Sequence, residues 1–290
     1  MHKHRVTTIV MGVLLASLAA LVLGACGSSG SSTSSSASAS PSASKAEQVL
    51  GHAPTGLAKQ IVDNGYFTAA NDANYAPQSI VKKDGSLVGF DVDTAKKVGE
   101  LLGLQVKFTN PAWDSIPTGL QTGRFDVSIG SMTITADRQK TLDFTEPYYY
   151  TPAVVITRAG TPGLDTIASL SGKTIGTSAS STYYAWLQAN TKATIKSYDS
   201  SVTSMTDLSR KRLDGVMTAA PTAQEAIAAG QPFQITGKPF FYEDLGFAIK
   251  KNEADWLAML NYAVKTMHQD GSLTAMSKQW YNGLDLTVKQ

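Results

Sequence analysis

From Leu57 to the C-terminus, short apolar runs alternate with amphipathic stretches, and this alternation restricts the chain to few folds. Apolar residues at every second position predict strands, whereas apolar residues three or four positions apart predict helices. The first block predicts strands over 66–70, 79–81, 87–90, 105–109 and 126–129, and helices over 91–102, 115–122 and 137–139. The second block predicts strands over 174–177, 194–198, 215–218 and 245–249, and helices over 182–189, 202–211, 222–229, 253–269 and 272–280. This pattern is typical of an α/β protein with largely parallel sheets.

The two blocks predict two lobes, because each is long enough for a small core but neither accounts for the whole chain of 290 residues. Ligands of such proteins usually lie between the lobes, where strand ends and helix N-termini converge.

The first residues of the chain have the features of a secretory signal. His2-Lys3-His4-Arg5 is positively charged, and the apolar run from Ile9 to Leu23 is short for a spanning helix, which needs roughly 20 residues. The run ends in Leu23-Gly24-Ala25-Cys26, which resembles a bacterial lipobox, in which the cysteine thiol accepts a diacylglycerol. The alternative is an uncleaved anchor with an incidental cysteine. We expect residues 1–25 to be a lipoprotein signal peptide and Cys26 to hold the protein outside the cell, on its membrane.

Serine dominates the segment after Cys26. Gly27–Ser44 contains 11 serines among 18 residues and no hydrophobic side chain larger than alanine, so it cannot bury enough apolar surface to fold. We expect residues 26–51 to be the lipidated cysteine and a flexible linker. A passive spacer and a tether that lets the globular part move above the membrane both fit this composition.

Charge and cysteine content exclude several classes of partner. Removal of Lys3 and Arg5 with the signal lowers the basic residues from 25 to 23, which equals the 23 acidic ones. A net charge near zero does not favour nucleic acid or an anionic membrane surface. One cysteine allows neither an internal disulfide nor a cysteine-based zinc site, and two of the four histidines lie in the signal. We therefore expect no metal ion and no cofactor.

Six short motifs follow one another in the globular part: Asp72–Pro77, Gly89–Asp93, Trp113-Asp114, Leu120–Asp126, Gly130–Arg138 and Asp143–Tyr149. In this order and spacing, residues 57–285 resemble the extracellular solute-binding protein family 3, the polar amino-acid receptors of ABC importers. The resemblance implies a two-lobed, periplasmic-binding-protein-like (type II) clamp with two interlobe crossings, near 150–154 and 242–246. Lobe 1 would then comprise 52–151 plus 247–290, and lobe 2 would comprise 152–246. We expect a monomer that delivers a small carboxylate-bearing ligand to the permease subunits.

Arg138 is the expected anchor of that ligand. It follows Thr135, which we expect to cap a short helix, and a cation at a helix N-terminus opposes the helix dipole unless an anion is present. A ligand carboxylate would satisfy both the guanidinium and the helix end. The alternative is a surface arginine that pairs across the first helical turn. The resemblance implies that Arg138 binds the ligand carboxylate.

The resemblance implies further ligand contacts from Asp72, Tyr75, Trp113, Gly130, Ser131, Thr133, Ser181 and Thr182. Most have a structural alternative: a turn for Asp72 and for Gly130, Ser131 and Thr133, the core for the two aromatics, and a helix cap for Thr182. For Gly89–Asp93 we expect only a structural role, in which Asp91 caps the following helix.

Two positions depart from the family pattern. Ser180 stands where the family usually has glycine, and Ala219 stands where it usually has the aspartate that accepts the α-ammonium group of the ligand. A desolvated ammonium without an anionic partner is costly. Either Glu243 or Asp244 compensates, or the ligand is a hydroxy acid or an N-substituted amino acid.

Three functions remain compatible with the sequence: a binding protein without catalysis, a dehydratase-type enzyme on the same fold, and a ligand-sensing lipoprotein that acts on another protein. We expect no enzyme, because no nucleophile–base order and no paired carboxylates of evident use are present.

Lipidation is directly testable. Mass spectrometry of the protein in native membranes should find Cys26 acylated, because the thiol lies at the lipobox position. An unmodified Cys26 thiol in those membranes would contradict the prediction.

Overall fold

The computed structural model describes residues 40–289, which lie within one compact unit, Ala39–Gln290. Residues 1–25, Cys26 and the linker up to residue 39 lie outside the described residues. The helices are α1 (Pro41–Leu50), α2 (Gly56–Asn64), α3 (Phe90–Leu102), α4 (Ile116–Gln121), α5 (Ala136–Gln139), α6 (Thr182–Asn190), α7 (Ser201–Ser209), α8 (Ala220–Ala228), α9 (Ala254–Gln269) and α10 (Ser272–Trp280). The strands are β1 (Tyr66–Ala70), β2 (Asn74–Tyr75), β3 (Ser79–Val81), β4 (Leu87–Val88), β5 (Gln105–Thr109), β6 (Val127–Thr133), β7 (Leu142–Phe144), β8 (Tyr149–Arg158), β9 (Thr174–Ser178), β10 (Thr194–Tyr198), β11 (Gly215–Ala219) and β12 (Phe233–Lys250). Within this part of the chain, no helix combines the length and apolar character needed to cross a membrane.

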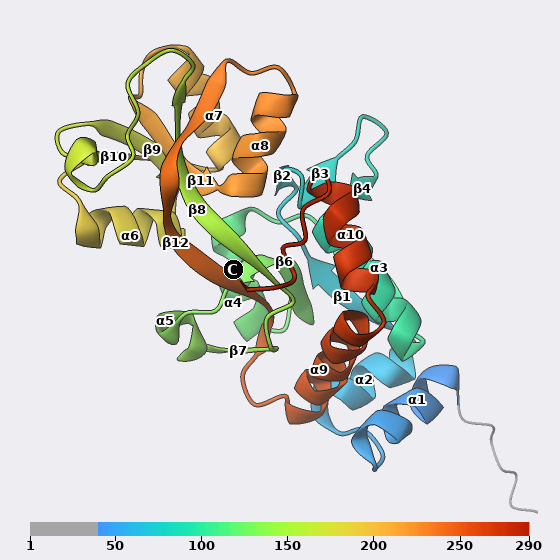
Figure 1. The fold of residues 1–290 in the computed structure, drawn as a ribbon. Coiled ribbons are helices and arrows are strands. Elements are labelled where there is room, and N and C mark those ends of the chain that lie inside the picture. Colours follow the sequence, from blue (N-terminus) through green and yellow to red (C-terminus); the bar gives the residue numbers. More distant parts are fainter. Residues whose placement is uncertain (1–39, 290) are drawn as a thin grey trace, which may run out of the picture. The chain divides into compact units, whose positions relative to one another are not determined.

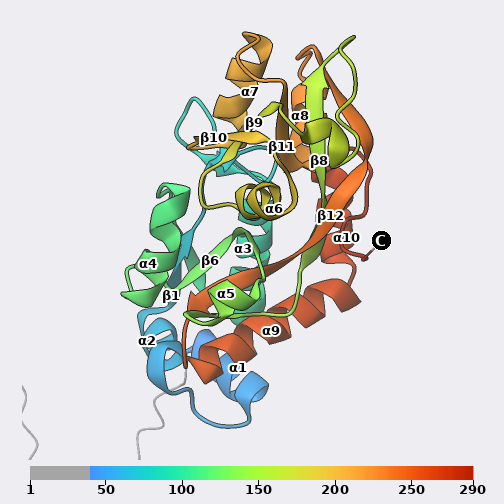
Figure 2. The same ribbon diagram turned by 90° about the vertical axis from the view of Figure 1, so that its left-hand side faces the viewer.

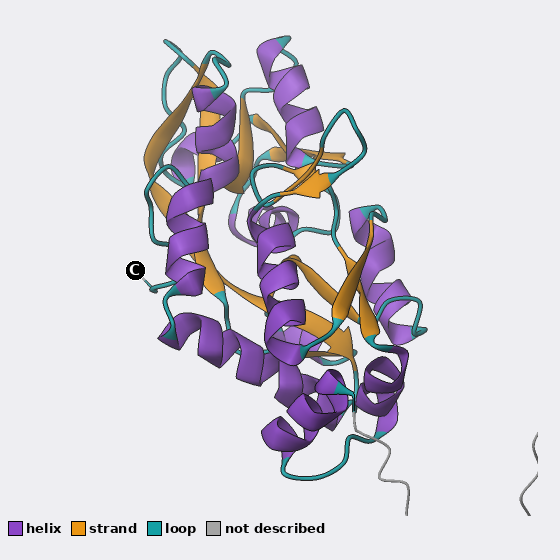
Figure 3. Cartoon of the chain, turned by 90° about the vertical axis from the view of Figure 1, so that its right-hand side faces the viewer, coloured by secondary structure: helices purple, strands orange, loops and turns teal. Residues whose placement is uncertain are grey.

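The predicted α/β architecture is confirmed. β1 pairs in parallel with β5 and β6, and β9 pairs in parallel with β10 and β11, as the alternation of strands and helices requires. These strands join in one sheet of order β10-β9-β11-β8-β12-β6-β1-β5, with β7 alongside β12, and β2, β3 and β4 form a second, small sheet. Helices lie on both faces of the large sheet (Figures 2 and 3).

Two long antiparallel strands, β8 and β12, run from one lobe into the other (Figure 1). They pair from Leu245↔Tyr149 to Phe233↔Arg158, with a register shift between Thr236 and Phe241. β12 also pairs with β6 in lobe 1, and β8 also pairs with β11 in lobe 2. The two predicted crossings, 150–154 and 242–246, both lie on this strand pair.

Each lobe has its own apolar core. In lobe 1, a large cluster around Trp256 and Phe67 fills one face of the sheet, and a smaller one around Ile116 and Leu120 includes residues of α4 and β6. In lobe 2, two separate clusters gather around Ile175 and around Leu208. Separate cores allow the lobes to move as rigid bodies about the strands that join them.

The prediction that Gly27–Ser44 remains unfolded is wrong for its last residues, because α1 begins at Pro41. The Ser40 hydroxyl accepts a hydrogen bond from the Ala43 N–H at 3.2 Å, and proline at the start of a helix loses no internal bond. Ala46 is fully buried in the core of lobe 1, and the Lys45 ammonium donates to the Tyr262 hydroxyl at 2.8 Å. Local capping and docking on α9 thus fold a segment whose composition is typical of disorder.

The prediction that Asp91 caps a helix is also wrong, because α3 begins one residue earlier, after Gly89. The Asp91 carboxyl is instead fully buried and accepts hydrogen bonds from the Ser131 hydroxyl at 2.7 Å and the Tyr148 hydroxyl at 2.6 Å. The Tyr148 hydroxyl in turn accepts from the Ser131 N–H at 3.0 Å. This cluster connects α3, β6 and the segment before β8, and it holds Ser131 at a φ of 56°. Burial raises the pKa of Asp91 to about 7, although both hydroxyls oppose the shift.

Asp91 should therefore make the protein less stable as the pH rises. Between pH 4 and 7 the carboxyl ionises in the unfolded chain but stays protonated in the folded one, so its contribution is complete below about pH 4 and lost above about pH 7. The loss could reach about 4 kcal/mol. Urea denaturation from pH 4 to 8 should show a smaller fall for Asp91→Asn than for the wild type. The exposed Asp63→Asn should keep the wild-type slope, and an Asp91→Asn variant with the full slope would contradict the assignment.

Candidate functional site

A pocket lies between the lobes, with about 530 Å³ of empty space when the part open to solvent is included. All nine residues for which ligand contacts are expected line it: Asp72, Tyr75, Trp113, Gly130, Ser131, Thr133, Arg138, Ser181 and Thr182. Of the two acids that were candidates to replace the missing aspartate, Glu243 lines the pocket and Asp244 does not; the Asp244 carboxylate pairs with Lys289 at 2.8 Å. Ala219 is fully buried and does not line the pocket.

The pocket forms where parallel strands end. Asp72 follows β1, Thr133 ends β6, Ser178 ends β9 and Asp199 follows β10. Within each lobe the parallel strands end along the same edge, and the strands of lobe 2 run opposite to those of lobe 1, so the two sets of strand ends face the pocket from both sides. The pocket therefore collects residues from both blocks of the sequence.

The Arg138 guanidinium is a half-buried cation. It donates to the Thr133 carbonyl at 2.9 Å and, across the lobes, to the Ser180 carbonyl at 3.4 Å, and it lies 5.4 Å from the centre of the Trp113 ring. None of the ion pairs within residues 40–289 includes Arg138. Burial lowers its pKa, and the negative charge of Glu243 opposes this shift. Because a guanidinium has five N–H donors, most of those of Arg138 remain available to an anion.

Thr135 positions this arginine. Its hydroxyl accepts from the Arg138 N–H at 3.2 Å, which is the predicted N-cap. The helix that it starts, α5, has only four residues, so the dipole at its N-terminus is small beside the full charge of the guanidinium.

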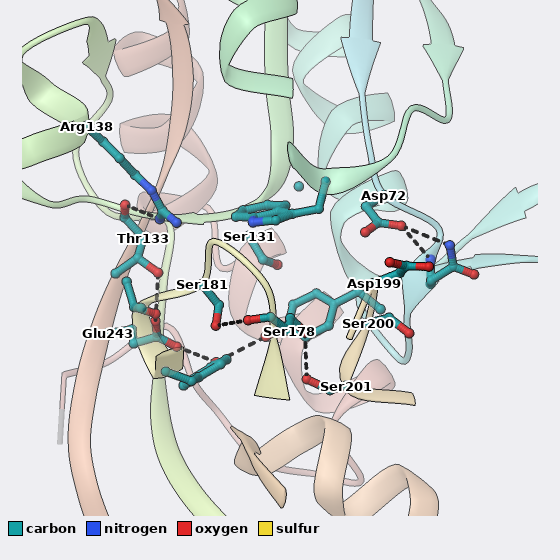
Figure 4. A pocket seen from close by; sticks show the side chains of 16 residues that line it. Asp72, Ser131, Thr133, Arg138, Ser178, Ser181, Asp199, Ser200, Ser201 and Glu243 are labelled. Carbon is teal, nitrogen blue, oxygen red and sulfur yellow. Dashed lines mark hydrogen bonds between the residues drawn. The ribbon is translucent and has the colours of Figure 1, made fainter. Parts of the chain in front are cut away.

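Glu243 is the second charged group of the pocket, and its side chain is only 3% exposed. One carboxylate oxygen accepts from the Thr133 hydroxyl at 2.7 Å and from the Thr182 hydroxyl, and the other accepts from Tyr183 at 2.5 Å and from Thr151 at 3.3 Å. These four hydroxyls come from lobe 1, from lobe 2 and from the crossing. Figure 4 shows Arg138, Thr133 and Glu243 together at one side of the pocket, with Asp72 and Asp199 at the other.

Two aromatic residues form walls between these ends. The Tyr75 hydroxyl lies 3.3 Å from the Tyr183 hydroxyl, and the Tyr75 ring packs against the lobe 2 cluster around Ile175, although Tyr75 belongs to lobe 1. Burial raises the pKa of both phenols, so they stay neutral. The Arg138 guanidinium lies over the face of the Trp113 ring.

Ser131 and Ser181, which are expected to contact the ligand, also form hydrogen bonds that fix the conformation of their own loops. The Ser131 N–H and hydroxyl are both engaged in the Asp91 cluster. The Ser181 hydroxyl accepts from the Tyr184 N–H at 3.1 Å and donates to the Ser178 carbonyl at 2.6 Å, so it caps α6. Ser180 has a φ of 55°, in the region that glycine adopts more readily than serine, so the glycine that is usual in the family would suit this backbone.

The far end of the pocket is acidic. One Asp72 oxygen accepts from the Asn74 N–H at 3.0 Å, which is the expected local turn, and burial nevertheless raises the pKa of Asp72. Asp199 is exposed at the rim.

Sequence reasoning did not single out Asn74, Ser178, Tyr183, Asp199, Ser200 and Ser201, which also line the pocket. Asp199, Ser200 and Ser201 follow a predicted strand, 194–198, as Asp72 follows 66–70. This position could have indicated from the sequence that they line the pocket.

Comparison with known proteins agrees with this architecture. Residues 67–283 match the sequence profile of the bacterial extracellular solute-binding proteins, family 3. The L-cystine-binding protein TcyJ of Escherichia coli is 29% identical over 242 residues, which cover 82% of this chain and 91% of that protein. The ABC transporter arginine-binding protein 1 of Escherichia coli is 32% identical over 215 residues, which cover 72% of this chain and 88% of that protein.

Among solved structures, the ancestral amino acid-binding protein AncCDT-1, a precursor of cyclohexadienyl dehydratase, superposes with a TM-score of 0.72 at 28% identity and covers 77% of this chain and 97% of its own. The predicted two-lobed, type II architecture is thus confirmed. With the match over residues 67–283, these similarities show that the chain belongs to the bacterial extracellular solute-binding proteins, family 3.

Proposed function

We propose that the protein is the substrate-binding component of an ABC importer and that it binds an amino acid between its two lobes. The observation that carries this proposal is the Arg138 guanidinium, which lines the pocket, is half-buried, and has no ion-pair partner within the described chain. A ligand carboxylate would supply the missing anion and accept two parallel hydrogen bonds. The relatives named above bind arginine and cystine, both of which carry this group.

Ligand binding would favour the closed arrangement of the lobes. Arg138 belongs to lobe 1 but already reaches the Ser180 carbonyl of lobe 2, and Thr182 approaches the same end of the pocket from lobe 2. A ligand that contacts both lobes has more interactions in the closed form, and so it shifts the equilibrium towards closure. The permease subunits would then recognise the closed form.

We propose that the site binds without catalysis. The pocket contains hydroxyls, carboxylates and a guanidinium but no histidine or cysteine. The hydroxyls near Glu243 come from three separate segments and donate to both of its oxygens, which is an arrangement for holding charge and not for activating one nucleophile. Formation of a new compound from the bound ligand, detected by mass spectrometry, would favour a dehydratase-type activity instead.

We also propose that the protein is a lipoprotein attached through Cys26 to the outer side of the cell membrane. The support is the lipobox-like Leu23-Gly24-Ala25-Cys26 after a charged and apolar leader, together with the occurrence of the only cysteine at that place.

Arg138→Ala should weaken amino-acid binding by roughly 100-fold or more, because a buried anion then has no cationic partner. The measurement is a thermal-shift screen of L-amino acids and L-cystine, in which a ligand at 100 times its dissociation constant stabilises the wild type by about 2.7 kcal/mol. Lys140→Ala is the matched control, since Lys140 lies two residues away, is exposed, and pairs only with Asp137. An Arg138→Ala protein that keeps the full shift would refute the proposed anchor.

A further inference from the structure

We infer that Glu243 and the hydroxyls that surround it form the receptor for the α-ammonium group of the ligand, so that the pocket selects α-amino acids with a free amine over the corresponding hydroxy acids. This inference rests on the proposed function, since it assigns the second half of the ligand's head group. It also decides between the two alternatives left open by Ala219, in favour of a relocated carboxylate.

Position 219 offers no carboxylate to the pocket, whereas position 243 does. Ala219 ends β11 and is fully buried, so this position offers no polar group to the pocket. Glu243 lies on β12 at the crossing between the lobes, and it lines the same pocket as Arg138. Its neighbour Asp244 pairs with Lys289 outside this pocket, which leaves Glu243 as the acid at the Arg138 end among the described residues that line it.

The direction of the hydrogen bonds makes this cluster a cation site. A carboxylate only accepts hydrogen bonds, so the hydroxyls of Thr133, Thr182 and Tyr183 must donate their protons to Glu243. The hydroxyl oxygens of Thr133 and Thr182 each keep a lone pair that can accept another bond, whereas the Tyr183 oxygen already accepts from the Tyr75 hydroxyl at 3.3 Å. All three residues line the pocket. An ammonium group has three donors and no acceptor, and it would therefore meet oxygen acceptors that are polarised by a buried negative charge.

Thr133 brings the two charge sites together. Its carbonyl accepts from the Arg138 guanidinium at 2.9 Å, and its hydroxyl donates to Glu243 at 2.7 Å. The anion-binding and cation-binding groups thus meet at one residue, as the carboxylate and ammonium of an α-amino acid meet at one carbon. Glu243 is not ion-paired within residues 40–289, although it is only 3% exposed, and an unpaired buried charge is unfavourable. A zwitterion would neutralise Glu243 and Arg138 together.

A purely structural role for Glu243 is the competing explanation. Its carboxylate connects Thr133 of lobe 1 with Thr182 and Tyr183 of lobe 2, so it could serve only to hold the lobes together. Loss of such a connection would weaken every ligand to the same degree. Loss of an ammonium receptor would weaken amino acids more than hydroxy acids, so the ratio of the two affinities separates the explanations.

The test is calorimetric titration of the full chain with the tightest-binding of L-arginine, L-cystine, L-histidine and L-glutamine, and with the α-hydroxy analogue of that compound. The wild type should prefer the amino acid by about 100-fold or more, because loss of the charged donor leaves buried polar groups unpaired. Glu243→Gln should reduce this preference to less than about 10-fold. Asp244→Asn is the matched control, since it removes one negative charge from the adjacent residue, and it should keep the wild-type ratio.

Two further variants keep the test decisive. Thr182→Val removes one acceptor without moving the carboxylate, and it should also lower the ratio; it replaces Glu243→Gln if that variant does not fold. Arg138→Ala should weaken both compounds and leave the ratio nearly unchanged. If no amino acid binds the wild type, the proposed function itself fails. If amino acids bind but the hydroxy analogue binds equally well, or if neither Glu243→Gln nor Thr182→Val changes the ratio, the proposed function stands and this inference is overturned.

Discussion

The pairing of β8 with β12 is the interaction on which the rest of the molecule depends. These strands are the only segments shared by the ladders of both lobes in the described chain, since β12 pairs with β6 on one side and β8 pairs with β11 on the other. Their backbone hydrogen bonds join the separate apolar cores of the two lobes. A pocket with walls from both cores can exist only while this ladder is intact.

The same strand pair places the charges of the pocket. β12 carries Glu243 into the crossing, and β6, its neighbour, ends in Thr133 and leads to Arg138. A carboxylate and a guanidinium are thereby brought to one end of the pocket without forming an ion pair with each other. Hydroxyls that donate to Glu243 compensate part of its negative charge, and carbonyls that accept from Arg138 compensate part of its positive charge. Neutral dipoles of this kind lower the cost of burial and leave the net charges available to a ligand.

Much of this arrangement could be predicted from the sequence, because it depends on local periodicity and on ordered motifs. The strands at 66–70, 105–109 and 194–198 have the predicted bounds, as does the last helix. The nine residues implied by the family motifs all line one pocket. Strand ends gather at one edge of a parallel sheet, so short motifs at those ends were sufficient to find the pocket wall.

What could not be predicted depends on long-range contacts. The first half of β12 has no clear period, and its strand conformation comes from pairing with β8. Helix α1 has the composition of a disordered segment, and its order comes from docking on α9. The choice between Glu243 and Asp244 was open because adjacent residues of a strand point to opposite sides, and only the register of the ladder decides which one faces the pocket.

The different groups that the two lobes bring to the pocket have a kinetic meaning. Lobe 1 provides the proposed carboxylate anchor, Arg138, and both aromatic walls, whereas lobe 2 provides the first turn of α6 around Thr182, the segment 199–201 and Glu243. If the site binds as proposed, a ligand docks on lobe 1 before closure, and the arrival of lobe 2 then covers it. In such a receptor the rate of release to the importer is controlled by a different part of the sequence from the rate of capture.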